Sequence, residues 1–320
     1  MKQLKEYSAI VNDAVANLHY GTPSTMYDPI EYTLAGGGKR IRPVLALAAA
    51  DAYGADLAKV ITPALGIEIY HNFTLLHDDI MDNSPTRRGR QSVWAKWDVA
   101  QAILSGDAML SHAMEMMTNN DFSDAQRIAL TRNFNTTAIA VDRGQQLDID
   151  FEKAAQVTPD EYIEMISLKT GALLAGACIT GAICGNASET ALKAFYDYGI
   201  NLGIAFQIQD DILDVYSDEA TLGKPIGGDI LNDKHTWLLI HAQEAAPDEV
   251  GAIYDAALTG QPKIDTMREV YDRHGIRALS EAAVARYTEL AVSALAGTGL
   301  PDDAAGWFTE FAHSLINRTK

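Results

Sequence analysis

The sequence of 320 residues has few cysteines, few basic residues and no long apolar run. Its two cysteines, Cys178 and Cys184, are too few for a disulfide framework, which is typical of a reducing compartment. Lysine and arginine number 25 against 43 aspartates and glutamates, so the formal net charge is −18. Such a charge repels nucleic-acid phosphates and anionic membranes. A nucleic-acid-binding protein and a disulfide-rich secreted mini-protein are therefore disfavoured.

The chain also lacks the features of membrane and secretory segments. It has no run of about eighteen apolar residues, and its amphipathic N-terminal segment does not resemble a signal peptide. We expect no stable membrane insertion and a cytoplasmic location.

Helical periodicity runs through almost the whole chain. Apolar residues recur at spacings of three and four, and no series of alternating strands is present. Thr158-Pro159-Asp160-Glu161 predicts a helix start, with a capping threonine, a proline in the first turn and acidic residues after it. No linker or repeat divides the chain, so the sequence predicts one all-α domain over residues 1–320.

One acidic pattern occurs twice. Asp78-Asp79-Ile80-Met81-Asp82 and Asp210-Asp211-Ile212-Leu213-Asp214 each follow a strongly apolar stretch. In each copy the first and last aspartates are four residues apart, which puts them about one helical turn apart on the same face. Carboxylates this close repel each other unless a cation offsets their charge. The absence of histidine and cysteine ligands argues against zinc, whereas Mg²⁺ prefers oxygen and is commonly shared with substrate phosphates. A solvated acidic turn is the alternative for one copy and is disfavoured by the repetition.

Basic residues gather near these acids and near glycines. Gly36-Gly37-Gly38-Lys39-Arg40-Ile41-Arg42-Pro43 is a glycine-rich loop before a helix, Thr86-Arg87-Arg88-Gly89 follows the first acidic motif, and Lys224 and Lys234 follow the second. Free backbone N–H groups, a helix start and guanidinium groups suit a phosphate. We infer a metal-bound diphosphate ligand, or two of them, with a hydrocarbon tail matched to the apolar helices. Arg40 is expected to point to solvent between Lys39 and Arg42, and His77 to be structural.

At this point the sequence resembles the trans-isoprenyl diphosphate synthase (polyprenyl synthetase) family, and in particular the short-chain farnesyl and geranylgeranyl diphosphate synthases. The elements that carry the resemblance stand in the family's order: GGGKRIRP, LLHDDIMDNSPTRRG, GQQLDID, LKTGALL, FQIQDDILD and GKPIGGDILNDK. The resemblance implies an isoprenoid-synthase-type helical bundle around a deep central cavity. It also implies head-to-tail condensation of isopentenyl diphosphate with an allylic diphosphate, in an enzyme that is usually a homodimer.

The same resemblance assigns roles to individual residues. Three Mg²⁺ ions would bind the allylic diphosphate and be held by Asp78, Asp82 and Asp210, with Asp79, Asp211 and Asp214 in the outer part of that metal network. The allylic diphosphate would contact Arg87, Lys169 and Lys224, with Lys234 nearby. The second diphosphate would be bound by Lys39, Arg42, His71 and Arg88. The developing allylic cation would face Thr170 and Gln207, and support for the lysines and metal would come from Gln145 and Asp148.

Product length is expected to depend on the helix before the first acidic motif. Phe73 lies five residues before Asp78, about 7.5 Å along a helix, where its bulk would block a growing chain. Thr74, one residue closer to Asp78, is small. In the resembled family, one aromatic residue here with a small neighbour tends to give C20, and two large residues tend to give C15. The sequence therefore favours geranylgeranyl over farnesyl diphosphate, with Phe73 as plain core packing the alternative.

Three other functions remain as alternatives. A class I terpene cyclase would share the fold but normally carries an asymmetric second metal motif, whereas the second motif here is a full DDILD. A non-catalytic regulatory subunit of a prenyl synthase would tend to lose one acidic motif, and both are intact. A purely structural helical protein would leave the acidic motifs and basic loops unexplained.

Overall fold

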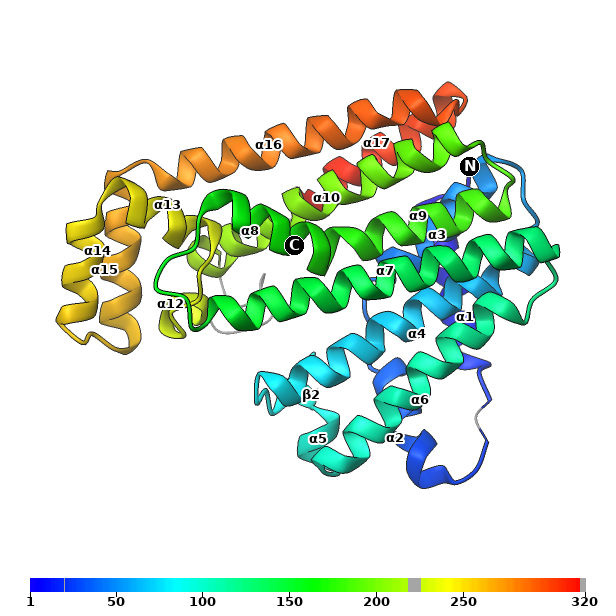
Figure 1. The fold of residues 1–320 in the computed structure, drawn as a ribbon, viewed down its shortest axis with the longest axis horizontal. Coiled ribbons are helices and arrows are strands. Elements are labelled where there is room, and N and C mark those ends of the chain that lie inside the picture. Colours follow the sequence, from blue (N-terminus) through cyan, green and yellow to red (C-terminus); the bar gives the residue numbers. More distant parts are fainter. Residues whose placement is uncertain (20, 218–225, 317–320) are drawn as a thin grey trace. The chain divides into compact units, whose positions relative to one another are not determined.

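The computed structural model describes residues 1–19, 21–217 and 226–316, and these are almost entirely helical (Figure 1). Apart from one short antiparallel ladder, no strand occurs in these ranges. The all-α prediction is therefore confirmed.

The chain forms two compact units. Unit 1 comprises Met1–Ala138, Leu173–Tyr196 and Gly297–Ala304, and unit 2 comprises Ile139–Ala172, Asp197–Ala296 and Ala305–Lys320. The predicted single domain over residues 1–320 depends on how the two units associate, and it stays a prediction.

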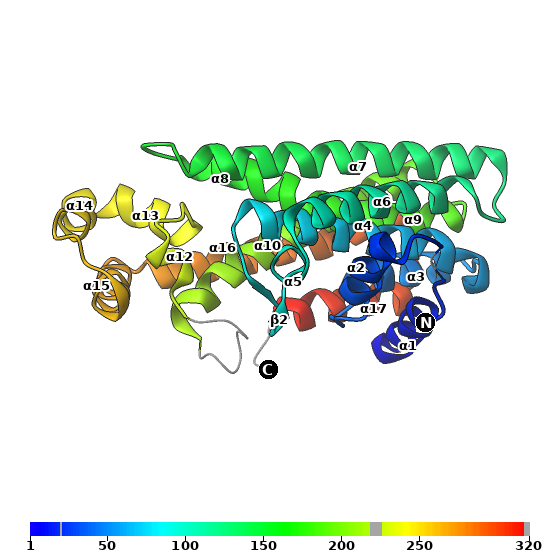
Figure 2. The same cartoon turned by 90° about the horizontal axis from the view of Figure 1, so that it is seen from below.

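Unit 1 is built around a long helix, α4, that ends in the first acidic motif. Helix α6 packs along it and lies beside it in Figures 1 and 2. The two backbones approach closely because Gly66 has no side chain: a Cβ there would lie 3.0 Å from the backbone carbonyl oxygen of Ala113 on α6. Helix α3 adds residues 43–50, an unbroken buried run of proline, valine, leucine and alanine, to the same core. The elements of unit 1 up to the long helix α7 are α1 (Leu4–Ala16), α2 (Ser24–Leu34), α3 (Ile41–Ala52), α4 (Leu57–Met81), β1 (Thr86–Arg87), β2 (Arg90–Gln91), α5 (Val93–Lys96) and α6 (Val99–Thr118).

Unit 2 begins within α7 (Asp124–Phe151) and contains the second acidic motif on α10 (Glu189–Tyr216). The predicted helix start at Thr158 is confirmed: Thr158 Oγ1 accepts from the Glu161 N–H at 3.3 Å, and the Glu161 carboxylate accepts from the Thr158 N–H at 2.8 Å. Helices α14 and α15 lie side by side in both ribbon views. The remaining elements of the chain are α8 (Pro159–Ile166), the π-helix η1 (Ser167–Gly171), α9 (Ala172–Cys184), α12 (Gly228–Leu231), α13 (Trp237–Ala245), α14 (Pro247–Asp255), α15 (Gly260–Arg273), α16 (Ile276–Ala294), the 3₁₀ helix η2 (Leu295–Thr298) and α17 (Asp302–Ile316).

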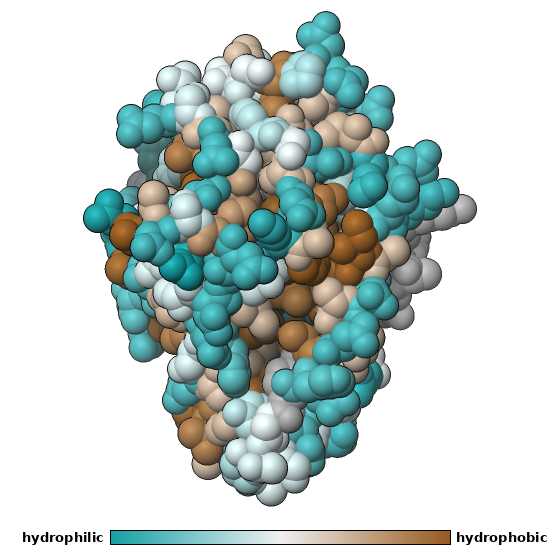
Figure 3. All heavy atoms as spheres, turned by 90° about the vertical axis from the view of Figure 1, so that its right-hand side faces the viewer, coloured by the Kyte–Doolittle hydropathy of each residue, from teal (hydrophilic) through white to brown (hydrophobic). Residues whose placement is uncertain are grey.

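One stretch, Pro159–Cys184, is long and apolar enough to cross a bilayer by length and composition alone, but 78% of its most apolar window is buried inside the protein. Burial of this kind is typical of a core helix. Cys178 and Cys184 lie within it as buried free thiols, and burial raises the pKa of Cys184 to about 12, so packing explains both. On the face drawn in Figure 3, hydrophilic side chains surround small hydrophobic patches.

Candidate active site

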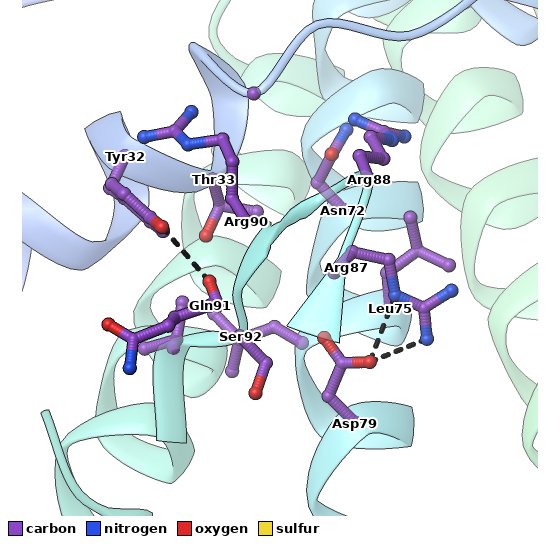
Figure 4. A pocket seen from close by; sticks show the side chains of 13 residues that line it. Tyr32, Thr33, Asn72, Leu75, Asp79, Arg87, Arg88, Arg90, Gln91 and Ser92 are labelled. Carbon is purple, nitrogen blue, oxygen red and sulfur yellow. Dashed lines mark hydrogen bonds and ion pairs between the residues drawn. The ribbon is translucent and has the colours of Figure 1, made fainter. Parts of the chain in front are cut away.

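The first acidic motif occupies the last turn of α4. The backbone N–H of Asp82 donates to the carbonyl of Asp78 at 2.8 Å, so the two aspartates lie one turn apart, as their spacing predicts. Asp79 differs from both because it is buried and accepts from Arg87, whose Nε and Nη2 lie 2.9 and 2.6 Å from Asp79 Oδ1 (Figure 4). Burial raises the pKa of Asp79, and the Arg87 guanidinium opposes that shift.

Arg87 and Arg88 lie on a short β-hairpin whose turn has positive φ angles. Strands β1 and β2 pair antiparallel, and the two turn residues, Arg88 and Gly89, have φ of 52° and 72°. Two left-handed residues match the twist of a tight hairpin, although a left-handed arginine is uncommon and somewhat strained. The Arg88 guanidinium donates to the carbonyl of Gly37 in the glycine-rich loop. A Cβ at Gly38 would lie 3.0 Å from that guanidinium, so the glycine makes room for it.

Arg42, at the start of α3, contacts His71 on α4. Arg42 Nη1 lies 3.1 Å from His71 Nε2. Burial and the surrounding arginines hold the pKa of His71 well below its usual value, so the imidazole is neutral and accepts this hydrogen bond. Burial lowers the pKa of Arg42 to about 10 while Glu68 opposes the shift, so Arg42 keeps its charge at neutral pH. Four residues were predicted to bind the second diphosphate. Arg42, His71 and Arg88 all lie at the glycine-rich loop or contact the helix that follows it. The fourth, Lys39, is an exposed residue of that loop.

The expectation that Arg40 points to solvent is wrong. The residue is only 5% exposed, and its Nη1 lies 2.6 Å from Glu68 Oε1 on α4. Arg40 has φ of 49° and directly precedes α3, and this left-handed backbone turns its side chain into the core instead of outward.

Phe73 lies in an aromatic cluster on α4. Its ring centroid is 5.5 Å from that of Tyr70 and 4.7 Å from that of His77, and Tyr70 also contacts Phe134 of α7 at 5.2 Å. The Thr74 hydroxyl donates to the His71 carbonyl at 2.8 Å. Phe73 is partly exposed, as a residue facing a tail would be, and its role in product length stays a prediction.

His77 is packed as a structural residue would be. Its Nε2 lies 3.2 Å from the Ile103 carbonyl on α6, and a Cβ at Gly106 would lie 2.2 Å from that nitrogen. Both observations agree with the structural role expected for His77.

In unit 2, one pocket is lined by Asp148, Lys169, Thr170, Gln207 and Lys234, together with Asp211. Lys169 Nζ lies 2.6 Å from Asp148 Oδ2, and Lys234 Nζ lies 3.7 Å from the same oxygen. Burial would raise the pKa of Asp148, but the two lysines outweigh it and hold the pKa below its usual value. The pocket therefore gathers residues that lie far apart in sequence and that the resemblance placed around one diphosphate and its cation.

Lys169 and Thr170 belong to the π-helix η1, which continues α8. A π-turn widens the helix and re-aims its side chains, and such turns are frequent at functional sites. Two glycines admit it: a Cβ at Gly144 on α7 would lie 2.3 Å from the Lys169 nitrogen, and one at Gly203 on α10 would lie 2.3 Å from Gly171 Cα. Gln207, one turn beyond Gly203, is 3.3 Å from the Thr170 hydroxyl through its Oε1.

The second acidic motif divides into a half-buried aspartate and two buried ones. Asp210 is half-buried, Asp211 is buried, and Asp214 is fully buried and accepts from the Asp229 N–H at 3.1 Å. Asp211 accepts from the Tyr162 hydroxyl at 2.5 Å and the Trp237 N–H at 3.0 Å. Burial, with Asp229 nearby, raises its pKa to about 7.

The six predicted metal-binding aspartates therefore have different surroundings. Asp79, Asp211 and Asp214 are buried and accept hydrogen bonds from the protein, which favours an outer position in a metal network. No group of three or more histidines, cysteines or acids within the described ranges could hold a metal by itself. Carboxylate oxygens are hard donors and fit Mg²⁺ that keeps waters and shares substrate phosphates. Lys224 lies outside the described residues.

Several residues of these sites carry no motif signal. Glu68 is an acid inside the apolar run before the first motif, and that isolation is a signal that could have marked it. Tyr162 and Trp237 hold Asp211 from two other helices. Lys263 of α15 is buried and lies 2.5 Å from Asp233, just before Lys234. These four residues lie outside the quoted motifs, and only folding brings them to the site.

Comparison with known proteins places these features in one family. Residues 23–273 match the family model described as polyprenyl synthetase. The chain belongs to the polyprenyl synthetase family. A "Short chain isoprenyl diphosphate synthase" of Methanothermobacter thermautotrophicus is 37% identical over 294 residues, covering 91% of this chain and 90% of that protein. A "Geranylgeranyl diphosphate synthase" of Methanosarcina mazei is 39% identical over 243 residues, covering 76% and 75%.

Solved structures agree with the family assignment. A crystal structure of a geranylgeranyl pyrophosphate synthase matches this polyprenyl synthetase with a TM-score of 0.93 and 36% identity over 100% of both chains. A geranylgeranyl pyrophosphate synthetase from Pyrococcus horikoshii matches with a TM-score of 0.91 and 33% identity, covering 98% of this chain and 97% of the other. The predicted isoprenoid-synthase-type fold is confirmed.

Proposed function

We propose that this polyprenyl synthetase is a Mg²⁺-dependent trans-prenyltransferase that condenses isopentenyl diphosphate head to tail with an allylic diphosphate. The observation that carries the proposal is the pocket of unit 2, in which Lys169, Lys234, Asp148, Thr170 and Gln207 converge. A pair of lysines suits a diphosphate, and the threonine and glutamine oxygens suit a carbocation.

The diphosphate of the allylic substrate is the leaving group of the proposed reaction, and its departure leaves the allylic cation. Asp78 and Asp82 of the first motif and Asp210 of the second would hold Mg²⁺, which supplies charge stabilisation to the departing diphosphate. Lys169 and Arg87 would bind the same diphosphate, with Lys234 nearby and Lys224 as a further contact. Charged donors that meet developing negative charge are worth several kcal/mol, on the order of 3 kcal/mol for a single donor. The polyprenyl synthetase relatives support this chemistry, and one related structure is described as complexed with calcium and isoprenyl diphosphate.

The second substrate would bind in unit 1. Lys39, Arg42, His71 and Arg88 would bind the diphosphate of isopentenyl diphosphate, where the neutral His71 leaves the Arg42 charge intact. The double bond of this substrate would attack the allylic cation, and a proton would then leave to the released diphosphate. Thr170 Oγ1 and Gln207 Oε1 would face the cation and stabilise it through their dipoles.

The product favoured is the C20 geranylgeranyl diphosphate over the C15 farnesyl diphosphate. Phe73 is the bulky residue of the predicted tail wall, and Thr74 beside it is small. The Saccharolobus solfataricus relative and two similar crystal structures carry the geranylgeranyl name. Related proteins of Mycobacterium tuberculosis, 33% identical over 88% of this chain, are named farnesyl diphosphate synthases. Both acidic motifs are intact, which supports a synthase over a terpene cyclase or a silent partner subunit.

The functional enzyme is proposed to be a cytoplasmic homodimer. Three apolar residues of α6, Val99, Ile103 and Leu104, are 45%, 45% and 54% exposed, which is a face that a second copy would cover. Light scattering on purified protein should give twice the mass of one chain. An Ile103→Lys variant should shift the mass toward one chain, and a monomeric wild-type protein would contradict the assembly.

A product assay tests the reaction. Purified protein, Mg²⁺ and labelled isopentenyl diphosphate are incubated with C5, C10 or C15 allylic diphosphates, and the dephosphorylated products are sized by chromatography. A linear C20 alcohol is the expected result. A cyclic hydrocarbon formed without consumption of isopentenyl diphosphate would indicate a cyclase, and the absence of any Mg²⁺-dependent product would contradict the proposal.

A further inference from the structure

Unit 1 contains an ion pair that is buried on both sides. Arg40 Nη1 lies 2.6 Å from Glu68 Oε1, and each side chain is only 3% exposed. Isolated buried charges are costly, and a buried pair persists only where geometry and further hydrogen bonds satisfy both groups. The surroundings of this pair meet that condition.

The guanidinium of Arg40 connects four segments of the chain. Besides Glu68 on α4, its Nη2 donates to the carbonyl of Leu34 at the end of α2 at 2.6 Å, and its Nε donates to Asn12 Oδ1 on α1 at 3.2 Å. Arg40 itself is the last residue of the glycine-rich loop and directly precedes α3. Glu68 is held in turn by Asn72, whose Nδ2 lies 2.9 Å from Glu68 Oε1. The fork of one arginine therefore ties the loop to three helices.

The residues on either side of this anchor are those proposed to bind the second diphosphate. Lys39 precedes Arg40, and Arg42 follows it by two residues on the first turn of α3. On the other side of the ion pair, His71 follows Glu68 by three residues, one turn along α4, and contacts Arg42 at 3.1 Å. The segment before the anchor has great conformational freedom because it contains consecutive glycines, and two of them have φ of 76° and 131°.

We propose that Arg40 and Glu68 are positioning residues that fix the glycine-rich loop, so that Lys39, Arg42 and His71 face the diphosphate of isopentenyl diphosphate. Arg40 does not bind the substrate itself, because its guanidinium is buried and donates to three protein acceptors. The inference rests on the proposed function for its substrate, whereas the anchoring of the loop does not depend on that function.

Arg40→Lys is the most direct test because it keeps the charge and removes the fork. A lysine at this position cannot reach all three acceptors, so any change reports on position and not on net charge. We expect the KM for isopentenyl diphosphate to rise about tenfold, as for the loss of one charge-assisted hydrogen bond, with the KM for the allylic substrate and kcat within about twofold. Hydrogen–deuterium exchange of the backbone at residues 36–42 should become faster.

Arg127→Lys is the matched control. Arg127 lies in the same unit on α7 and, like Arg40, donates to a carboxylate, Asp124, and to a backbone carbonyl, that of Asn120, but its side chain is 39% exposed. The same chemical change there should leave both KM values and the loop exchange unaltered.

A double variant covers the case in which Arg40→Lys does not fold. Arg40→Met combined with Glu68→Met removes both buried charges together, a change that proteins often tolerate. Leu34 and Asn12 still lose their donor, so the positioning role predicts a raised KM for isopentenyl diphosphate in a folded protein. A purely structural role predicts a normal KM once folding is preserved.

The outcomes separate this inference from the proposed function. If the two substrates' KM values rise equally, or if the KM for isopentenyl diphosphate and the loop exchange stay unchanged in folded variants, the positioning role is overturned. If the wild-type protein consumes no isopentenyl diphosphate, the proposed function fails instead. In that case faster exchange of residues 36–42 in Arg40→Lys would still support the anchor.

Discussion

Lys169 Nζ lies 2.6 Å from Asp148 Oδ2, which joins the π-helix η1 to the final turns of α7. Lys169 is 25% exposed and Asp148 is 14% exposed, so the contact is partly shielded from water. The carboxylate holds the ammonium group at the pocket that both residues line, whereas the lysine alone would be free to turn away. A cation held at this position fits a role in stabilising the departing diphosphate.

Lys169→Met should therefore lower kcat on the allylic substrate by about a hundredfold, the effect of removing one aimed charged donor from a transition state. The measurement is steady-state kinetics with saturating isopentenyl diphosphate. Lys153→Met, at an exposed lysine of the same unit, is the control and should leave kcat unchanged. An unchanged kcat in Lys169→Met would assign the lysine to structure.

The dependence of activity on Mg²⁺ should be set by three aspartates: Asp78, Asp82 and Asp210. Asp78→Asn and Asp210→Asn each remove one negative oxygen donor, so activity should fall by about a thousandfold and should require more Mg²⁺. Chelation by EDTA should abolish the wild-type activity, and Mg²⁺ should restore it. Asp107→Asn, at an exposed aspartate of α6, should titrate with Mg²⁺ like the wild type. If the activity of both motif variants depended on Mg²⁺ concentration as in the wild type, Asp78 and Asp210 would not be metal ligands.

His71 should remain neutral through the physiological pH range. In the folded protein, burial holds the pKa of His71 well below 6.5, and the positive charges of four nearby arginines add to this effect: Arg42, Arg88, Arg87 and Arg40. In the unfolded chain, the pKa of His71 has its usual value. A depressed folded pKa gives a stability contribution that is present above the unfolded pKa of about 6.5 and is lost as the pH falls toward the folded value. The NMR signals of His71 should show no titration between about pH 6 and pH 8. A His71 titration near about pH 6.5 would contradict the neutral assignment.

Phe73→Ala should lengthen the product. The substitution removes a ring that contacts Tyr70 and His77, and it opens the predicted tail wall by the volume of a side chain. Chromatography of dephosphorylated products should show alcohols longer than those of the wild type. Tyr196→Ala, at a 49% exposed aromatic residue, should leave product length unaltered. The same product from Phe73→Ala and wild type would place the floor of the pocket elsewhere.

Tyr162→Phe should destabilise unit 2 through Asp211. The Tyr162 hydroxyl lies 2.5 Å from the buried Asp211 carboxylate, and its loss leaves a buried acceptor with fewer donors. The free energy of unfolding in urea should fall by about 1–3 kcal/mol. The comparison is Tyr216→Phe, which removes a solvent-exposed bond to Asp272 and should cost less than about 1 kcal/mol. Equal decreases in the free energy of unfolding in the two variants would show that the burial of Asp211 does not determine the size of the effect.

The local features were predictable because they depend on near neighbours in sequence. A four-residue spacing alone puts Asp78 and Asp82 one turn apart, and a threonine, a proline and a glutamate suffice to start α8 at Thr158. The cationic loop was also visible, because its glycines and arginines are contiguous. Arg40 shows where local reasoning failed: Lys39 beside it is exposed, whereas Arg40 turns inward to Glu68, a residue 28 positions away in sequence.

The sequence by itself determined the helical class, the family, the two acidic motifs and most of the candidate site residues. Those properties follow from periodicity and from ordered short motifs. The tertiary structure decided which of those residues are buried, which are paired and which are exposed. It paired Asp79 with Arg87, Asp211 with Tyr162 and Arg40 with Glu68. Such pairs join distant segments, and their protonation and exposure depend on desolvation, which no pattern along the chain encodes.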